Sequence, residues 1–122
     1  MQPIVVGIDG GAPSMLALAW AAAEADLRAV PLRIVHGRSL HSVVPSSRMA
    51  GAPELYVPDD WAANAERDLA DARDRATEQA PGIEITMASE PVDPGQLLVE
   101  LSNSAELVVV GSRGLGGFAG LL

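Results

Sequence analysis

The chain has 122 residues and carries 16 acidic side chains against 8 basic ones, for a formal net charge of −8. It contains no Cys and no Lys, which excludes disulfides, thiol catalysis, Cys-ligated zinc, a Walker A phosphate site and a lysine base. The acidic balance argues against nucleic acid or an anionic membrane held by a broad basic surface. No apolar run reaches the roughly 18 residues of a membrane span and no signal-like segment opens the chain, so we expect a cytoplasmic protein.

The first third of the chain predicts a strand, a helix and a second strand. Residues 3–8 form a short, continuous apolar run, which suits a strand buried on both faces. A turn-like segment at 9–13 leads into a helix that Pro31 ends, because proline cannot continue a helix. The apolar positions at helical spacing, which we expect to face the core, are Leu16, Trp20, Ala23 and Leu27. Residues 32–36 predict the second strand, and 38–58 a long polar loop.

The rest of the chain continues the alternation. Asp59 and Asp60 cap a second helix that stops at Pro81. Its apolar positions are Trp61, Ala65, Leu69, Ala72 and Ala76. Residues 83–88 alternate between apolar and polar, which is typical of a half-exposed strand. A third helix begins at Asp93-Pro94, and we expect its Leu97, Leu98 and Leu101 to face the core. A fully apolar strand at 107–110 then runs into a glycine-rich segment at 111–117.

Alternating strands and helices predict an α/β fold: a doubly wound, Rossmann-like open parallel sheet with helices on both faces. The runs at 3–8 and 107–110 are the most apolar, so we expect them in the centre, with the alternating strand at an edge. With strands numbered along the chain, the simplest order is 3-2-1-4. There is no internal repeat or linker, so we expect residues 1–122 to form a single domain.

The order 3-2-1-4 creates a switch point between the first and fourth strands, and ligands of open α/β sheets bind there, at the carboxyl ends of the strands. Both strands lead into glycine-bearing loops, at 7–11 and 111–117. Without Cβ atoms, their backbone N–H groups can approach a phosphate closely. Ser112 can add a hydroxyl, Arg113 a guanidinium fork, and Asp9 can accept from a ribose hydroxyl or an adenine amino group.

The same residues have simpler explanations. Gly111 also fits plain turn geometry, Asp9 a helix-entry residue and Arg113 a solvated surface arginine, and a single G-x-x-G is a weak motif. The only imidazoles are those of His36 and His41, and we expect His36, after a buried strand, to be structural. Ser14 and Ser112 have no evident partner, so no catalytic residue and no metal site are predicted. The solvated face expected for the second helix includes Asp68, Asp71 and Asp74.

Several segments together resemble a universal stress protein domain. They are IVVGIDG at 4–10, the alanine-rich helix with Trp20, IVH at 34–36 and LVVVGSRG at 107–114. The resemblance covers nearly the whole chain in order and spacing, apart from the loop around 38–58. It implies a doubly wound parallel sheet with five strands, which is similar to the fold predicted from the patterning.

The resemblance to nucleotide-binding members implies a site for ATP between the first and fourth strands, where Mg²⁺ can accompany the nucleotide. An aspartate after the first strand contacts the nucleoside and matches Asp9, and a residue after the second contacts adenine through its backbone and matches Gly37. The phosphate motif reads Gly, two residues, Gly, nine residues, Gly, then Ser or Thr, and its first two glycines match Gly111 and Gly114. The resulting nucleotide-binding set is Asp9, Gly10, Gly37, Val110, Gly111, Ser112, Arg113, Gly114, Gly116 and Gly117.

The sequence also departs from the family pattern. The family usually has Ser where Gly11 stands and a branched apolar residue where Gly37 stands. The second half of the phosphate motif would begin at position 124, beyond the last residue. We therefore expect a domain without the family's last helix and fifth strand, about 20 residues. Its fourth strand would be an edge covered by a homodimer partner or a tandem domain.

Other enzyme and receiver classes fit less well. An ATP-pyrophosphatase needs S-G-G-x-D-S after the first strand, where this chain has DGGAPS at 9–14. A phosphoacceptor receiver needs a cluster of acids at the first strand and a lysine, and this chain has only Asp9 there and no Lys. A dinucleotide site needs G-x-G-x-x-G after the first strand, and the glycines at 7, 10 and 11 do not have that spacing. Two main hypotheses remain: a regulatory module that binds ATP in the stress response, and a stress or interaction domain of the same fold that binds no nucleotide. Weak ATP hydrolysis ranks below both.

Overall fold

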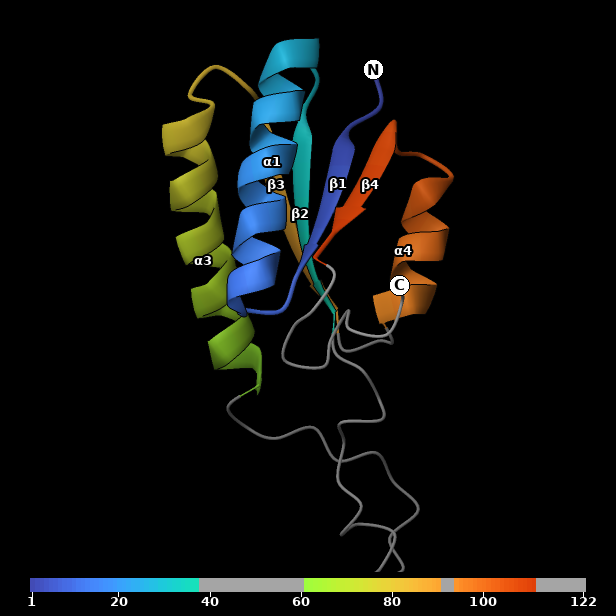
Figure 1. The fold of residues 1–122 in the computed structure, drawn as a ribbon. Coiled ribbons are helices and arrows are strands. Elements are labelled where there is room, and N and C mark those ends of the chain that lie inside the picture. Colours follow the sequence, from blue (N-terminus) through green and yellow to red (C-terminus); the bar gives the residue numbers. More distant parts are fainter. Residues whose placement is uncertain (38–60, 91–93, 112–122) are drawn as a thin grey trace, which may run out of the picture.

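The computed structural model describes residues 1–37, 61–90 and 94–111 (Figure 1). Strands and helices alternate along them as predicted. The elements are β1 (Ile4–Ile8), α1 (Ala12–Arg28), β2 (Leu32–Gly37), α3 (Trp61–Gln79), β3 (Ile85–Glu90), α4 (Pro94–Ser102) and β4 (Leu107–Val110). The predicted loop at 38–58 and the predicted caps Asp59, Asp60 and Asp93 lie outside the described residues.

The strands form one parallel sheet in the order β3-β2-β1-β4, which confirms the predicted order 3-2-1-4. The register aligns the strand ends: Ile8 of β1 lies beside His36 of β2, and Gly7 of β1 beside Val110 of β4. Because the strands are parallel and in step, the segments that leave β1, β2 and β4 all start at the same edge of the sheet (Figure 1).

Helices cover both faces of the sheet, as predicted. Figure 1 shows α1 and α3 together on one face and α4 on the other. Alternate residues of β1 point to opposite faces, so the core has two parts. Val6 and Ile8 pack with the helices α1 and α3, whereas Val5 packs with Leu97 and Leu98 of α4.

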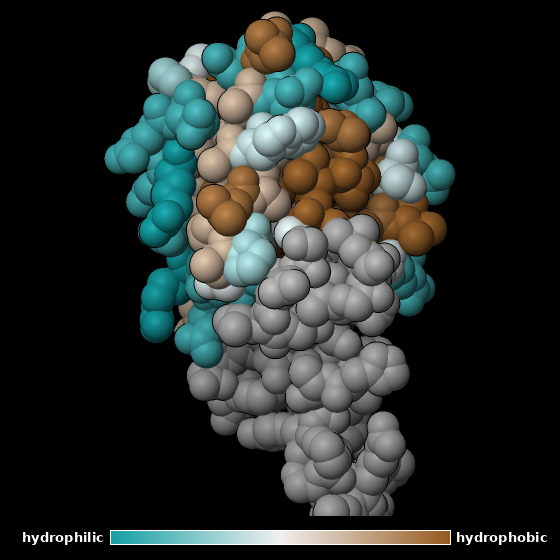
Figure 2. Space-filling model, viewed as in Figure 1, coloured by the Kyte–Doolittle hydropathy of each residue, from teal (hydrophilic) through white to brown (hydrophobic). Residues whose placement is uncertain are grey.

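The two strands that flank the switch point differ in burial. All of β1 is buried, whereas every residue of β4 is only half-buried. Within the part of the chain that the structure describes, β4 pairs with β1 alone and is the end strand of the sheet. The expected central position is therefore observed for β1 and not for β4 among these residues. Figure 2 shows hydrophobic surface over β4, between α1 and α4.

The predicted core face of α1 is wrong. Leu16, Trp20 and Leu27 are 74%, 52% and 80% exposed, and Ala23 is exposed as well. The residues that α1 buries instead are Ser14, Ala17, Leu18, Ala21, Ala22 and Ala25. These positions also recur at helical spacing, so α1 has two apolar faces and periodicity alone could not choose between them.

The other two helices turn the predicted faces inward. In α3 the buried apolar residues are Ala65, Leu69, Ala72 and Ala76, and in α4 Leu97 and Leu98 are buried with Leu101 half-buried. The side chain of Trp61 lies outside what the structure describes. None of the helices in the described ranges is long and apolar enough to cross a membrane.

Candidate functional site

The loop between β1 and α1 is held by the side chains of Asp9 and of Ser14 in the first turn of α1. Asp9 Oδ1 accepts a hydrogen bond of 2.8 Å from the Gly11 backbone N–H. The Ser14 hydroxyl, 2% exposed, donates to the Gly11 carbonyl at 2.8 Å and accepts from the Asp9 N–H at 3.3 Å. Ser14 therefore has a structural role: it fixes the loop, which the sequence did not reveal.

The end of β4 lies directly against the start of α1. A Cβ added at Gly111 would be 2.9 Å from the carbonyl carbon and oxygen of Pro13 and 3.0 Å from the Ser14 nitrogen. Real Cβ atoms essentially never come that close to backbone atoms, so only glycine fits without a shift of the chain. Gly111, the first residue of the glycine-rich segment, therefore lies against the first turn of α1, and this glycine has a packing reason of its own.

Half of the predicted nucleotide-binding residues are described, and they lie together at the carboxyl ends of the strands. Asp9 and Gly10 follow β1, Gly37 ends β2, and Val110 and Gly111 stand at the end of β4. Asp9, Val110 and Gly111 are half-buried, whereas Gly10 is exposed. The other five residues, Ser112, Arg113, Gly114, Gly116 and Gly117, lie outside the described residues.

Sequence reasoning missed a contact between β2 and α3 beside this loop. His36 Nε2 lies 3.2 Å from Asp68 Oδ2, with the His36 side chain 9% and the Asp68 side chain 33% exposed. The carboxylate of Asp68 also lies against Gly10, because a Cβ there would meet Asp68 Oδ2 at 2.7 Å. Gly10 has φ +88°, a region that L side chains rarely adopt.

The solvated face expected for α3 needs one correction. Asp71 and Asp74 are exposed as predicted, and Asp71 Oδ2 lies 3.2 Å from Arg75 Nε. Asp68 instead turns toward the sheet. It stands three residues after Ala65 and four before Ala72, both buried, so its spacing from the buried stripe was the signal that could have placed it.

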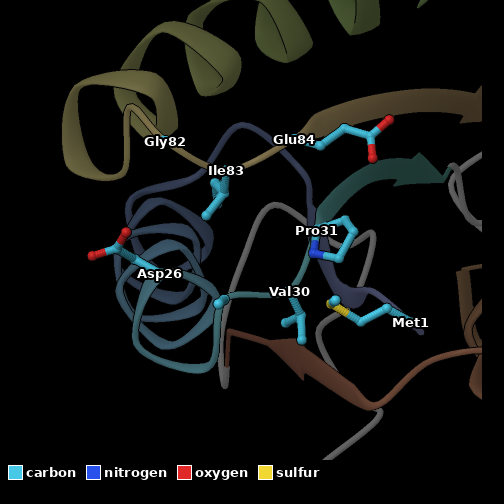
Figure 3. A pocket seen from close by; sticks show the side chains of 8 residues that line it. Met1, Asp26, Val30, Pro31, Gly82, Ile83 and Glu84 are labelled. Carbon is cyan, nitrogen blue, oxygen red and sulfur yellow. The ribbon is translucent and has the colours of Figure 1, made fainter.

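Two cavities lie at opposite ends of the sheet. A groove of about 530 Å³ borders the β1–α1 loop, lined by Gly10, Ala12, Met15, Leu16, Asp68, Asp71 and Arg75. A pocket of about 320 Å³ lies at the amino ends of the strands, where Met1, Val30, Pro31 and Ile83 form its apolar wall (Figure 3). Its two carboxylates, Asp26 and Glu84, lie on opposite sides of the view and do not converge.

The described residues hold no group of three or more potential metal ligands.

A model of the universal stress protein family matches residues 1–122. The chain belongs to the universal stress protein family. It is 40% identical to universal stress protein Rv2623 of Mycobacterium tuberculosis over 98% of this chain and 38% of that protein. It is 35% identical to universal stress protein Mb2028c of Mycobacterium bovis over 98% of this chain and 41% of that protein. The chain thus spans about two fifths of the length of these relatives.

Solved structures of the family share the fold. A universal stress protein in complex with cAMP matches at TM-score 0.69 and 29% identity, over 98% of this chain and 80% of that chain. Protein Rv1636 from Mycobacterium tuberculosis matches at TM-score 0.64 and 27% identity, over 99% and 79%. The universal stress protein from Archaeoglobus fulgidus, at TM-score 0.67 and 21% identity over 98% and 88%, supports the fold alone.

Proposed function

We propose that this chain is a regulatory module of the stress response that binds an adenine nucleotide, ATP with Mg²⁺, between the carboxyl ends of β1 and β4. The observation that carries the proposal is the contact of Gly111 with the first turn of α1, 2.9 Å from Pro13 to the Cβ position. The glycine-rich segment therefore starts beside the β1–α1 connection. The related universal stress protein solved with cAMP supports an adenine nucleotide as the class of ligand.

The proposed roles divide between nucleoside and phosphates. Asp9 accepts from the nucleoside, and its Oδ1, already held by the Gly11 N–H, keeps the carboxylate oriented. Gly37 contacts adenine through its backbone. The segment from Gly111 offers backbone N–H groups to the phosphates, and the residues proposed for it are Val110, Gly111, Ser112, Arg113, Gly114, Gly116 and Gly117, with Gly10 across the crevice.

Electrostatics makes the metal ion part of the proposal. The β1–α1 loop lies near the carboxylates of Asp9 and Asp68, and the whole chain carries a net charge of −8. Free ATP would be repelled by these charges, whereas a bound Mg²⁺ neutralises part of the phosphate charge. We therefore expect ATP to bind much more tightly with Mg²⁺ than with a chelator.

Isothermal titration calorimetry with ATP and Mg²⁺ tests the proposal. We expect saturable binding that cAMP, AMP or ADP compete for, and weaker binding in EDTA. Absence of heat at millimolar ATP, with the protein shown to be folded by circular dichroism, would contradict nucleotide binding.

A pair of glycine variants localises the site. Gly114→Val should abolish ATP binding without unfolding the domain, because a branched Cβ blocks the approach of a phosphate. Gly82→Val is the matched control, since no atom lies within 4 Å of its Cβ position, at the far end of the sheet. Unchanged affinity in Gly114→Val would show that the phosphates bind elsewhere.

The alternative is a stress or interaction domain of the same fold that binds no nucleotide. It is favoured by Gly111, whose packing against Pro13 explains this glycine without a phosphate, and by the family departures at Gly11 and Gly37. The calorimetry decides between the two. Weak ATP hydrolysis is a third candidate, which fails if phosphate release is no faster with protein than in buffer.

We also propose that a partner covers β4. Its residues are half-buried although all four are apolar, and such an edge invites pairing with another chain. A homodimer partner or a tandem domain would supply the cover, and the greater length of the curated relatives is compatible with the second. Hydrogen exchange of the β4 amides tests this, because a covered edge exchanges slowly.

A further inference from the structure

We propose that the outer face of α1 is a self-association surface, on which α1 of a second copy of this chain packs antiparallel. The surface, called here the α1 stripe, consists of Leu16, Trp20, Ala23 and Leu27. It lies away from the sheet and away from the β4 edge, and it is not part of the proposed nucleotide site.

The α1 stripe has the spacing of a helix-pairing seam. Its residues are separated by four, three and four positions, the a/d repeat by which two helices pack along a shared line. Leu16, Trp20 and Leu27 are 74%, 52% and 80% exposed. Three large side chains exposed to this degree on one helix face amount to an apolar area on the order of 400 Å², within the range of the largest patches on soluble monomers, which commonly mark interaction sites.

The α1 stripe is complementary to itself under a two-fold axis. When α1 lies antiparallel to its copy with the axis between Trp20 and Ala23, Leu16 of one copy faces Leu27 of the other. Trp20 then faces the small Ala23, so a large side chain meets a small one at both central positions. A two-fold interface requires this kind of reciprocal match, so the α1 stripe meets the condition for pairing with a second copy.

Charge on the flanks agrees with the same arrangement. A groove of about 470 Å³ between α1 and α3 is lined by Met15, Leu18, Ala19, Arg75, Glu78 and Gln79. In the antiparallel pair, exposed Asp26 of one copy lies over Ala19 of the other and reaches toward its Arg75. Arg75 pairs with Asp71 of its own chain, and the two side chains are 60% and 58% exposed, so this weak pair leaves Arg75 able to contact Asp26. Glu78 in the same groove repels Asp26 and so reduces the attraction. The contact between Asp26 and Arg75 therefore determines the orientation of the two helices more than it raises the affinity of the dimer.

The area sets the strength of the association. A stable interface buries about 800 Å² per partner, roughly twice the α1 stripe. The pair thus buries less than a stable dimer needs, so we expect a weak dimer that forms only at high protein concentration and exchanges readily with monomer.

Sedimentation velocity over a concentration series tests the proposal. We expect a reversible monomer–dimer equilibrium that Leu16→Glu and Leu27→Glu each weaken at least about tenfold, because each buries a charge at an apolar contact. The matched control is Val99→Glu on α4, on the opposite face of the sheet and 68% exposed, which should leave the equilibrium unchanged. A chain that stays monomeric, or a dimer equally weakened by Val99→Glu or unaffected by the stripe variants, would overturn the proposal.

Two further variants test the geometry itself. The chain has no Cys, so Ala23→Cys introduces a single thiol, and the two thiols of the pair lie within about 10 Å by helix-packing distances. A short bismaleimide should cross-link Ala23→Cys and not Val99→Cys. Asp26→Arg and Arg75→Asp should each weaken the dimer, and the double variant should recover it. Cross-linking of both cysteine variants alike, or no recovery in the double variant, would contradict the antiparallel pairing.

Discussion

The two faces of α1 are both apolar, yet they have opposite fates. The outer face carries the large residues Leu16, Trp20 and Leu27, each more than half exposed. The inner face is mostly small, and its buried alanines are Ala17, Ala21, Ala22 and Ala25. The comparison shows that burial follows the space available: α1 packs against both the sheet and α3, and alanine lets the helix approach both closely. Among its large aliphatic residues Leu18 is buried, whereas Leu16 and Leu27 lie at the surface.

The largest expected effect comes from two leucines on opposite faces of α1. Leu18 is 1% exposed and Leu16 is 74% exposed, so the same truncation removes very different contacts. Leu18→Ala should lower the free energy of unfolding by about 2–5 kcal/mol, and Leu16→Ala by less than about 0.5 kcal/mol. Urea denaturation in dilute solution measures both. Equal losses would mean that the outer face is buried in the folded chain.

Adding volume gives the next effect. Ala21 is fully buried, whereas Ala23 is exposed on the outer face. Ala21→Leu should cost about 1–3 kcal/mol, because a close-packed layer has no room for three more carbon atoms. Ala23→Leu should stay within about 0.5 kcal/mol. A neutral Ala21→Leu would show that the inner face of α1 is loosely packed and would remove the reason given for its alanines.

The one polar residue of the inner face provides a smaller effect. The buried Ser14 hydroxyl bonds both the Asp9 N–H and the Gly11 carbonyl, so Ser14→Ala removes two hydrogen bonds that hold the β1–α1 loop. We expect a loss of about 1–2 kcal/mol and weaker ATP binding, since the β1–α1 loop is no longer fixed. Ser102→Ala is the control: its hydroxyl donates to the Val99 carbonyl, but it is exposed, and water can replace that bond. An intact affinity in Ser14→Ala would separate loop rigidity from nucleotide binding.

The fold could be predicted from the sequence because local pattern determines it. Alternating strands and helices impose a parallel sheet, and the connections leave few orders for four strands. The inward face of α1 could not be predicted, because Leu16 and Leu18 both belong to apolar stripes and only the positions of the sheet and α3 decide between them.

The candidate site divides in the same way. Topology placed Asp9 and Gly111 at one edge of the sheet, since strand order and direction fix where strand ends lie. The contact between His36 and Asp68, 32 residues apart, depends on how α3 packs on β2. The close approach of Gly111 to Pro13 likewise depends on tertiary packing, and the sequence showed only a glycine after a strand.

The smallest effect concerns the border between the two faces at the end of α1. Arg28 Nε lies 2.7 Å from Glu24 Oε1, with side chains 38% and 22% exposed, and its Nη1 lies 3.7 Å from Glu106 Oε1 just before β4. Arg28→Ala should cost about 0.3–0.5 kcal/mol, a loss that vanishes at high salt because partly exposed ion pairs are screened. Arg75→Ala, which removes a more exposed pair with Asp71, should cost less. If the loss of unfolding free energy in Arg28→Ala did not depend on salt, the aliphatic stem of Arg28 would be packing against the end of α1. The border of the helix, like its inner face, would then be stabilised by packing and not by charge.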